Sequence, residues 1–145
     1  KDFLPLLNKK VYLETNATLS EKFLEIKPFV DIVSADIKLE SATGIKDSYK
    51  FHDKFFEACQ GVETFAKIVF NSKITDEEIA KCCNIGGKYG IELVLQPEMG
   101  FDNTLEHPDF MTVNSEFCAK ILDKFLANYS NVRLIPQVHK FLDVR

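Results

Sequence analysis

The sequence has 145 residues, of which 46% are hydrophobic and 28% are charged, as in an ordinary globular domain. Its net charge of −4 argues against a nucleic-acid-binding surface, which needs a dense basic patch. No apolar run approaches the roughly 20 residues that span a bilayer, so we expect no membrane partner.

Short β-prone runs alternate with amphipathic helical patterns along the chain. The runs that we expect to form strands are residues 11–15, 30–38, 65–70, 91–95 and 132–136. The segments that we expect to form helices are residues 19–29, 47–60, 76–89 and 114–129. Repeated strand–helix units imply parallel strands joined by right-handed crossovers, so the predicted fold class is α/β.

Local signals mark several boundaries. Ser20 is the expected N-cap of the first helix, and residues 40–44 are expected to form a loop. Thr75 and Glu78 have the spacing of a capping box, and Gly90 is placed to end the helix that follows it.

The helical segment 47–60 is predicted to bury Phe51, Phe55 and Cys59, which are spaced i, i+4, i+8. His52 lies in a charged stretch of the same segment, and we expect it to be solvated. The four cysteines form no C-x-x-C pair and fall on or near apolar helix faces. We expect buried free thiols, which fit a reducing, cytoplasmic location.

Periodicity alone leaves two architectures open, a doubly wound sheet and part of a (β/α) TIM-like barrel. We favour the partial barrel because polar residues follow every predicted strand and would converge at one edge. In both architectures, the carboxyl ends of the strands build the ligand site. These polar segments are residues 14–16, 36–38, 71–72, 96–97 and 137–140.

Asp36 and Lys38 stand two residues apart at the end of an apolar run, so both side chains point to the same face. They would bind a ligand there or form an ion pair at the rim. Asn16 is a candidate ligand contact, with turn formation as the alternative. His139, which lies close to Gln137, is a candidate site residue, with a structural role as the alternative. The sequence has no Gly-rich phosphate loop and no His/Cys/Asp set with metal-ligand spacing, so we expect no metal ligands in this chain.

Taken together, the strand-end segments resemble the later strands of radical S-adenosylmethionine (SAM) enzymes. The resemblance is closest to the 7-carboxy-7-deazaguanine synthase-like group, within the organic-radical activating enzymes. The segments that carry it are residues 11–16, 31–39, 41–44, 95–97, 135–140 and 141–145. One departure is Ala17, which stands where the family usually has Gly after the Glu-Thr-Asn triplet.

The resemblance implies that residues 1–145 are the C-terminal part of a radical SAM barrel domain whose [4Fe-4S]-binding N-terminal part is not in this sequence. By matching position, the residues expected at the SAM site are Thr15, Asn16, Ser34, Asp36, Lys38 and Gln96. The residues expected nearer the substrate are Gln137 and His139.

The implied activity is a carbon–nitrogen lyase reaction through a 5′-deoxyadenosyl radical. Its substrate would be 6-carboxytetrahydropterin on the route to queuosine-type bases, with Mg²⁺ and a reductant such as flavodoxin. The first alternative is an activase of a glycyl-radical enzyme, such as pyruvate formate-lyase or anaerobic ribonucleotide reductase. The second is a cluster-less α/β binding module. A partial barrel with an open side often dimerises, so a homodimer is one expected assembly.

Overall fold

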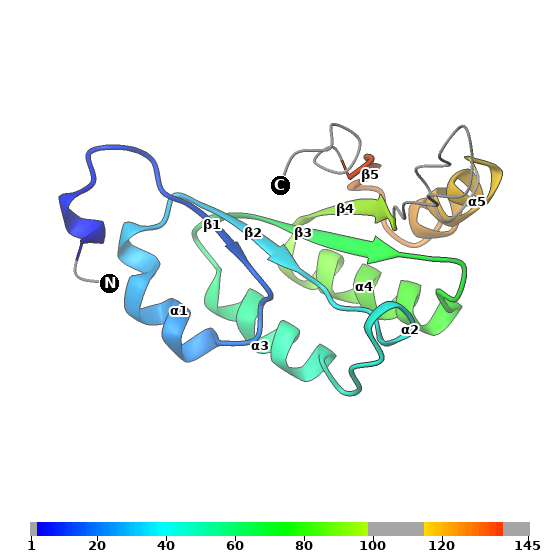
Figure 1. Ribbon diagram of the computed structural model, residues 1–145, viewed down its shortest axis with the longest axis horizontal. Coiled ribbons are helices and arrows are strands. Elements are labelled where there is room, and N and C mark those ends of the chain that lie inside the picture. Colours follow the sequence, from blue (N-terminus) through cyan, green and yellow to red (C-terminus); the bar gives the residue numbers. More distant parts are fainter. Residues whose placement is uncertain (1–2, 99–114, 138–145) are drawn as a thin grey trace, which may run out of the picture.

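The computed structural model describes residues 3–98 and 115–137. Five parallel strands form one sheet in the order β1-β2-β3-β4-β5 (Figure 1). The strands are β1 (Tyr12–Thr15), β2 (Ile32–Asp36), β3 (Glu63–Phe70), β4 (Glu92–Pro97) and β5 (Val132–Leu134). The predicted α/β class and parallel strands are therefore confirmed.

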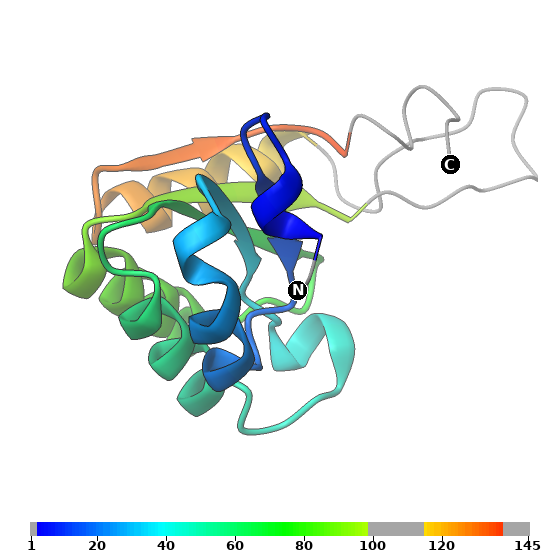
Figure 2. The same cartoon turned by 90° about the vertical axis from the view of Figure 1, so that its left-hand side faces the viewer.

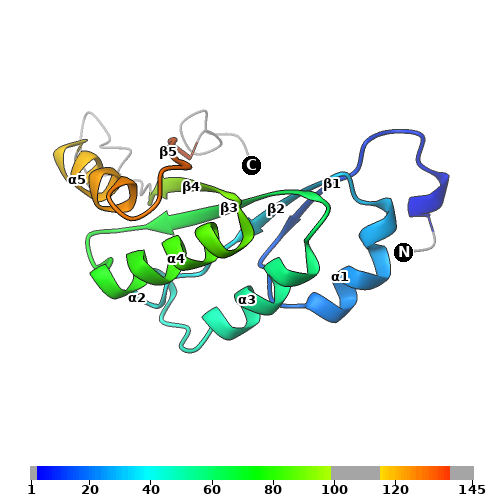
Figure 3. The same cartoon turned by 180° about the vertical axis from the view of Figure 1, so that it is seen from behind.

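Helices connect consecutive strands and form a layer on one face of the sheet. They are α1 (Ser20–Ile26), α3 (Tyr49–Ala58), α4 (Asp76–Tyr89) and α5 (Ser115–Leu126). The single turn α2 (Glu40–Thr43) and the 3-10 turn η2 (Lys27–Phe29) also lie in the connections, whereas the 3-10 turn η1 (Leu4–Leu6) precedes β1. Figures 2 and 3 show α1, α3 and α4 side by side along the strands. α5 continues this layer beside α4.

The strand order bears on the two architectures that periodicity left open. A doubly wound sheet reverses its strand order at one point, where the helices change faces. The described sheet has no such reversal, because each strand lies beside its neighbours in sequence. It is singly wound, an arrangement that (β/α) barrels share.

The layer between sheet and helices is the hydrophobic core. Alternation along β3 points Ala66, Ile68 and Phe70 toward the helices, and all three are buried. Phe55 of α3 and Phe125 of α5 belong to the same buried cluster. All four cysteines are free and buried, as predicted. None of the helices in the described residues is long and apolar enough to cross a membrane.

The capping box that opens α4 is confirmed. The Glu78 amide donates to Thr75 Oγ1 at 3.2 Å, and the Thr75 amide donates to Glu78 Oε2 at 2.9 Å. Gly90 ends the helix in the left-handed conformation with φ of 66°, also as predicted.

Three local predictions are wrong. Leu19, without a side-chain cap, precedes α1, and Ser20 is already helical. The α-helix stops at Ile26 and passes into the turn η2, whose Pro28 has no backbone N–H to donate. Residues 40–44 are not a plain loop: they form the single turn α2, which Gly44 ends with φ of 73°.

The buried face of α3 also differs from the prediction. Phe51 is 47% exposed, whereas His52 is completely buried together with Phe55 and Phe56. The spacing i, i+3, i+4 places these three side chains on one face. Burial of His52 is tolerated because both ring nitrogens have backbone partners, so the expectation of a solvated histidine is wrong.

Candidate functional site

The face of the sheet opposite the helices carries charged side chains near the carboxyl ends of the strands. Strand alternation places Glu14, Ser34, Asp36 and Lys67 on this face. The parallel register sets Glu14 beside Ser34, and Asp36 beside Lys67. The edge predicted to hold the ligand site is therefore polar.

Three of these side chains, Glu14, Lys67 and Asp36, form a charge network of alternating sign with Lys38, which follows β2. Lys67 Nζ pairs with Glu14 Oε1 and lies 3.5 Å from Asp36 Oδ1. Lys38 Nζ lies 2.7 Å from Asp36 Oδ2, so the ion pair, one of the two alternatives for these residues, is present. Two cations and two anions on one surface can bind a ligand that carries both charges.

Lys67 is the member of this network that sequence reasoning missed. Burial opposes its charge, but the hydrogen bond with Glu14 and the nearby Asp36 carboxylate outweigh burial and raise the pKa of Lys67. The ammonium therefore stays protonated at neutral pH. The available signal was a lone lysine inside the otherwise apolar run of β3, at a position that alternation places opposite the core.

Ser34 is fully buried in β2, and its Oγ has no hydrogen-bond partner within the part of the chain that the structure describes. Leaving a buried hydroxyl unpaired costs about 1–3 kcal/mol. Its position beside Glu14 puts this unsatisfied group next to the charge network.

The turn after β1 uses the predicted site residues Thr15 and Asn16 for its own hydrogen bonds. Thr15 Oγ1 accepts from the Ala17 amide at 3.2 Å, and Asn16 Oδ1 accepts from Thr18 Oγ1 at 2.8 Å. Ala17 is buried and has a φ of 55°, the left-handed conformation in which Ala is less stable than Gly.

His52 connects this turn to the end of β2. His52 Nδ1 lies 3.2 Å from the carbonyl oxygen of Ala17, and the Lys38 amide donates to His52 Nε2 at 3.1 Å. Ser48 Oγ donates to the carbonyl oxygen of Lys38 at 2.9 Å. Both backbone groups of Lys38 are thus bound by α3 and the residue that precedes it.

The remaining predicted residues lie around the same edge. Gln96 is half-buried in β4, where it pairs with Val69 of β3. Gln137 is buried just beyond β5, while His139 lies outside the described residues. A small pocket of about 140 Å³ opens at the ends of β2 and β3, and its lining includes Asp36, Lys38 and Val69.

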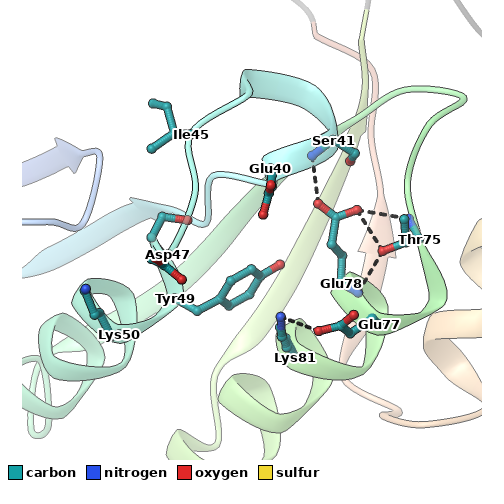
Figure 4. A pocket seen from close by; sticks show the side chains of 11 residues that line it. Glu40, Ser41, Ile45, Asp47, Tyr49, Lys50, Thr75, Glu77, Glu78 and Lys81 are labelled. Carbon is teal, nitrogen blue, oxygen red and sulfur yellow. Dashed lines mark hydrogen bonds and ion pairs between the residues drawn. The ribbon is translucent and has the colours of Figure 1, made fainter.

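A larger pocket, of about 410 Å³, lies between the segment 40–50 and the start of α4 (Figure 4). Its buried carboxylate, Glu78, caps α4 and also accepts from the Ser41 amide at 2.9 Å. Burial opposes ionisation, but these backbone hydrogen bonds outweigh it and lower the pKa of Glu78. The Tyr49 hydroxyl lies 3.6 Å from Cys82 Sγ, and burial raises the pKa of Tyr49.

The described residues contain no group of three or more His, Cys, Asp or Glu side chains suited to a metal ion. Burial raises the pKa of Cys59 and Cys83 to about 11 and that of Cys82 to about 12, so the thiolate form that binds iron is disfavoured. These cysteines do not fit a [4Fe-4S] cluster, and the described carboxylates do not assemble a Mg²⁺ site.

Sequence relatives were found among curated proteins. The chain is 33% identical over 144 residues to the 7-carboxy-7-deazaguanine synthase of Geobacter sulfurreducens, covering 97% of this chain and 55% of that protein. It is 32% identical to the synthase of Archaeoglobus fulgidus, covering 99% of this chain and 61% of that protein.

A third synthase, from Methanopyrus kandleri, is 32% identical over 92% of this chain and 48% of its own length. This chain is a relative of the 7-carboxy-7-deazaguanine synthases. It spans about half the length of these synthases. The suggested relation to this group is therefore confirmed.

Other comparisons add little to this relation. No protein-family model matches the chain. A solved structure from Bacteroides thetaiotaomicron, provisionally named an alpha-L-fucosidase, aligns with 86% of this chain and 45% of its own, at a TM-score of 0.47 and 15% identity. A likeness at this level carries no argument about function.

Proposed function

We propose that the whole protein is a radical SAM enzyme of the 7-carboxy-7-deazaguanine synthase type. The observation that carries the proposal is the relation to three synthases over nearly the whole of this chain. The charge network at the strand ends supports it, because Asp36 and Lys38, two of the residues that the sequence resemblance implies at the SAM site, belong to this network. The substrate would be 6-carboxytetrahydropterin, as expected from the sequence resemblance.

The described sheet would be the later part of a (β/α) barrel. Two features support this proposal: the sheet is singly wound, and β1 lies at its edge. Exposed apolar side chains stand on this edge strand and on the helix that follows it, namely Tyr12 of β1, Leu24 of α1 and Leu19 before it. Further strands of the whole protein would pair with β1 and cover these side chains.

The charge network fits SAM, whose amino acid part carries an ammonium and a carboxylate beside a sulfonium. Glu14 and Asp36 would face the cationic groups, while Lys38 or Lys67 would bind the carboxylate. The unpaired hydroxyl of Ser34 would gain a partner when a ligand occupies this edge. Thr15, Asn16 and Gln96 would complete the contacts, and Gln137 and His139 would lie toward the substrate.

In such an enzyme, a [4Fe-4S] cluster and SAM together supply the 5′-deoxyadenosyl radical. The cluster ligands would come from outside the described residues, because the cysteines described here do not fit the cluster. The task of this chain would be to bind and orient SAM and to exclude water from the radical. A reductant such as flavodoxin would be a partner of the whole protein.

The test is anaerobic turnover by the full-length protein. We would supply 6-carboxytetrahydropterin, SAM and a reductant, and measure the 7-carboxy-7-deazaguanine formed. The expected result is product that depends on both the pterin and SAM. A protein that takes up iron and cleaves SAM without forming this product would contradict the synthase activity. A protein that takes up no iron would contradict radical chemistry and support a binding module.

A further inference from the structure

The buried imidazole of His52 lies behind the charge network and bridges two loops at the strand ends. A carbonyl oxygen can only accept a hydrogen bond, so Nδ1 of His52 must donate its proton to Ala17. The backbone amide of Lys38 can only donate, so Nε2 of His52 must carry the free electron pair. The two partners together select the neutral imidazole with the proton on Nδ1.

Each bridged loop needs this imidazole for a different reason. Ala17 is buried in a left-handed turn that its own side chain disfavours, so the bond to its carbonyl helps to hold the turn. Lys38 lies just beyond the strand pairing of β2, where the Ile37 amide makes the last bond to Lys67. Without His52, the Lys38 amide would lose its partner.

Ser48 and His52 form a clamp on the backbone of Lys38. They stand four residues apart, Ser48 at the N-cap of α3 and His52 in its first turn, so both side chains lie on one face. Ser48 binds the carbonyl of Lys38, and His52 binds its amide. The clamp fixes the backbone from which the Lys38 side chain reaches Asp36.

We propose that His52 is a positioning residue, which locks the loops after β1 and β2 together and so places the Lys38 ammonium for ligand binding. The proposal rests on the proposed function for the identity of the ligand, SAM. The bridge itself stands on the geometry alone. His52 does not contact the ligand edge directly, since it acts through the backbone of two other residues.

The clamp is sensitive to acid. Burial lowers the pKa of His52, and the Lys38 ammonium lowers it further, against the opposing effects of the Ala17 carbonyl and the Asp36 carboxylate. Tyr49 stands edge-on to the ring, with centroids 6.2 Å apart. Protonation would point a second N–H at the Lys38 amide and break that bond. The clamp is therefore intact at neutral pH and fails as the pH falls through the lowered pKa.

The experiment compares full-length wild type with His52→Leu, His52→Gln and the matched control Phe51→Ala. Leu fills space without hydrogen bonds, Gln keeps one donor and one acceptor but does not titrate, and Phe51 is exposed at the neighbouring position. Two quantities are measured: the hydrogen-exchange protection of the Lys38 amide and the dissociation constant for SAM.

In His52→Leu, we expect the Lys38 protection factor to fall about tenfold or more and SAM to bind about tenfold more weakly. His52→Gln and Phe51→Ala should stay within about threefold of wild type. Wild type should also lose Lys38 protection on acidification, whereas His52→Gln should not.

Unchanged Lys38 protection in His52→Leu would overturn the clamp. Lost protection with wild-type SAM affinity would overturn the positioning role. If wild type itself binds no SAM, the proposed function fails, while the protection factors still decide the clamp. If His52→Leu does not fold, the pH dependence of Lys38 amide protection in wild type and His52→Gln decides. The same loss of protection on acidification in both proteins would overturn the proposal.

Discussion

The two faces of the parallel sheet carry opposite kinds of side chain, apolar on one face and charged on the other. The helix-covered face is closed and apolar: Ile68 and Phe70 of β3 are fully buried there, in the same core cluster as Phe125 of α5. The other face of the same strand carries Lys67 within a network of charges. Residues one position apart in β3 therefore belong to a stabilising core and to a candidate ligand site.

This contrast separates stability from binding in a way that substitutions can test. Burial of apolar side chains is the main source of folding free energy, so changes on the helix side should mainly affect stability. Partly exposed ion pairs contribute little to stability, so changes on the charged face should mainly affect ligand affinity.

The largest effect is expected for Phe125→Ala on the helix side. Removing a fully buried ring leaves a cavity in the core, and the free energy of unfolding should fall by about 3–5 kcal/mol. Denaturant-induced unfolding measures this change. Phe51→Ala, at an exposed position, is the control and should change stability by about 0.5 kcal/mol or less. A loss below about 1 kcal/mol for Phe125→Ala would contradict the tight packing described for this face.

The capping box at the start of α4 should rank second. Thr75→Ala removes the acceptor of the Glu78 amide, and unfolding free energy should fall by about 1–2 kcal/mol.

Glu78→Gln tests the ionic part of the same box. The pKa of Glu78 is lowered in the folded state, so its ionised carboxylate stabilises the fold at pH values above its unfolded pKa of about 4.5. This stabilisation is lost as the pH falls. Wild type should therefore lose more stability than Glu78→Gln between pH 6 and the acid range. Parallel pH profiles of unfolding free energy would rule this contribution out.

Lys67→Met should have a small effect on stability and a large one on binding. The ion pairs of Lys67 are partly solvated, so unfolding free energy should change by about 1 kcal/mol or less. SAM affinity of the full-length protein should fall about tenfold, because the network loses one of its two cations. Calorimetric titration and denaturant unfolding on the same samples separate the two effects. Equal SAM affinity in Lys67→Met and wild type would remove Lys67 from the ligand site.

Ser34→Ala should have the smallest effect on stability, and its sign is informative. The substitution removes a buried hydroxyl that has no partner in the described structure, so unfolding free energy should stay constant or rise by up to about 1 kcal/mol. SAM affinity should decrease if the ligand supplies the missing partner. A loss of more than about 1 kcal/mol in stability would show that the hydroxyl already has a partner in the free protein.

Sequence patterns predicted most of the elements because their signals are local. Alternation of apolar residues marks a strand, and the spacing of Thr75 and Glu78 marks a helix start, within a few neighbouring positions. Boundaries were less certain where two local structures compete, as at Pro28, where the helix passes into a 3-10 turn. The placement of Asp36 and Lys38 on one face was also predictable, since they stand two residues apart at one strand end.

Strand order, the burial of His52 and the place of Lys67 in the charge network were decided only by tertiary structure. The partners of His52 are 14 and 35 residues away, and Lys67 meets Glu14 across 53 residues. Whether a polar side chain can be buried depends on whether such distant groups satisfy it. The sequence by itself determined the strands, the helices and the relation to the synthases. The fold brought together the charges and the histidine behind them, because hydrogen bonds and ion pairs between distant segments form only once the parallel strands are aligned.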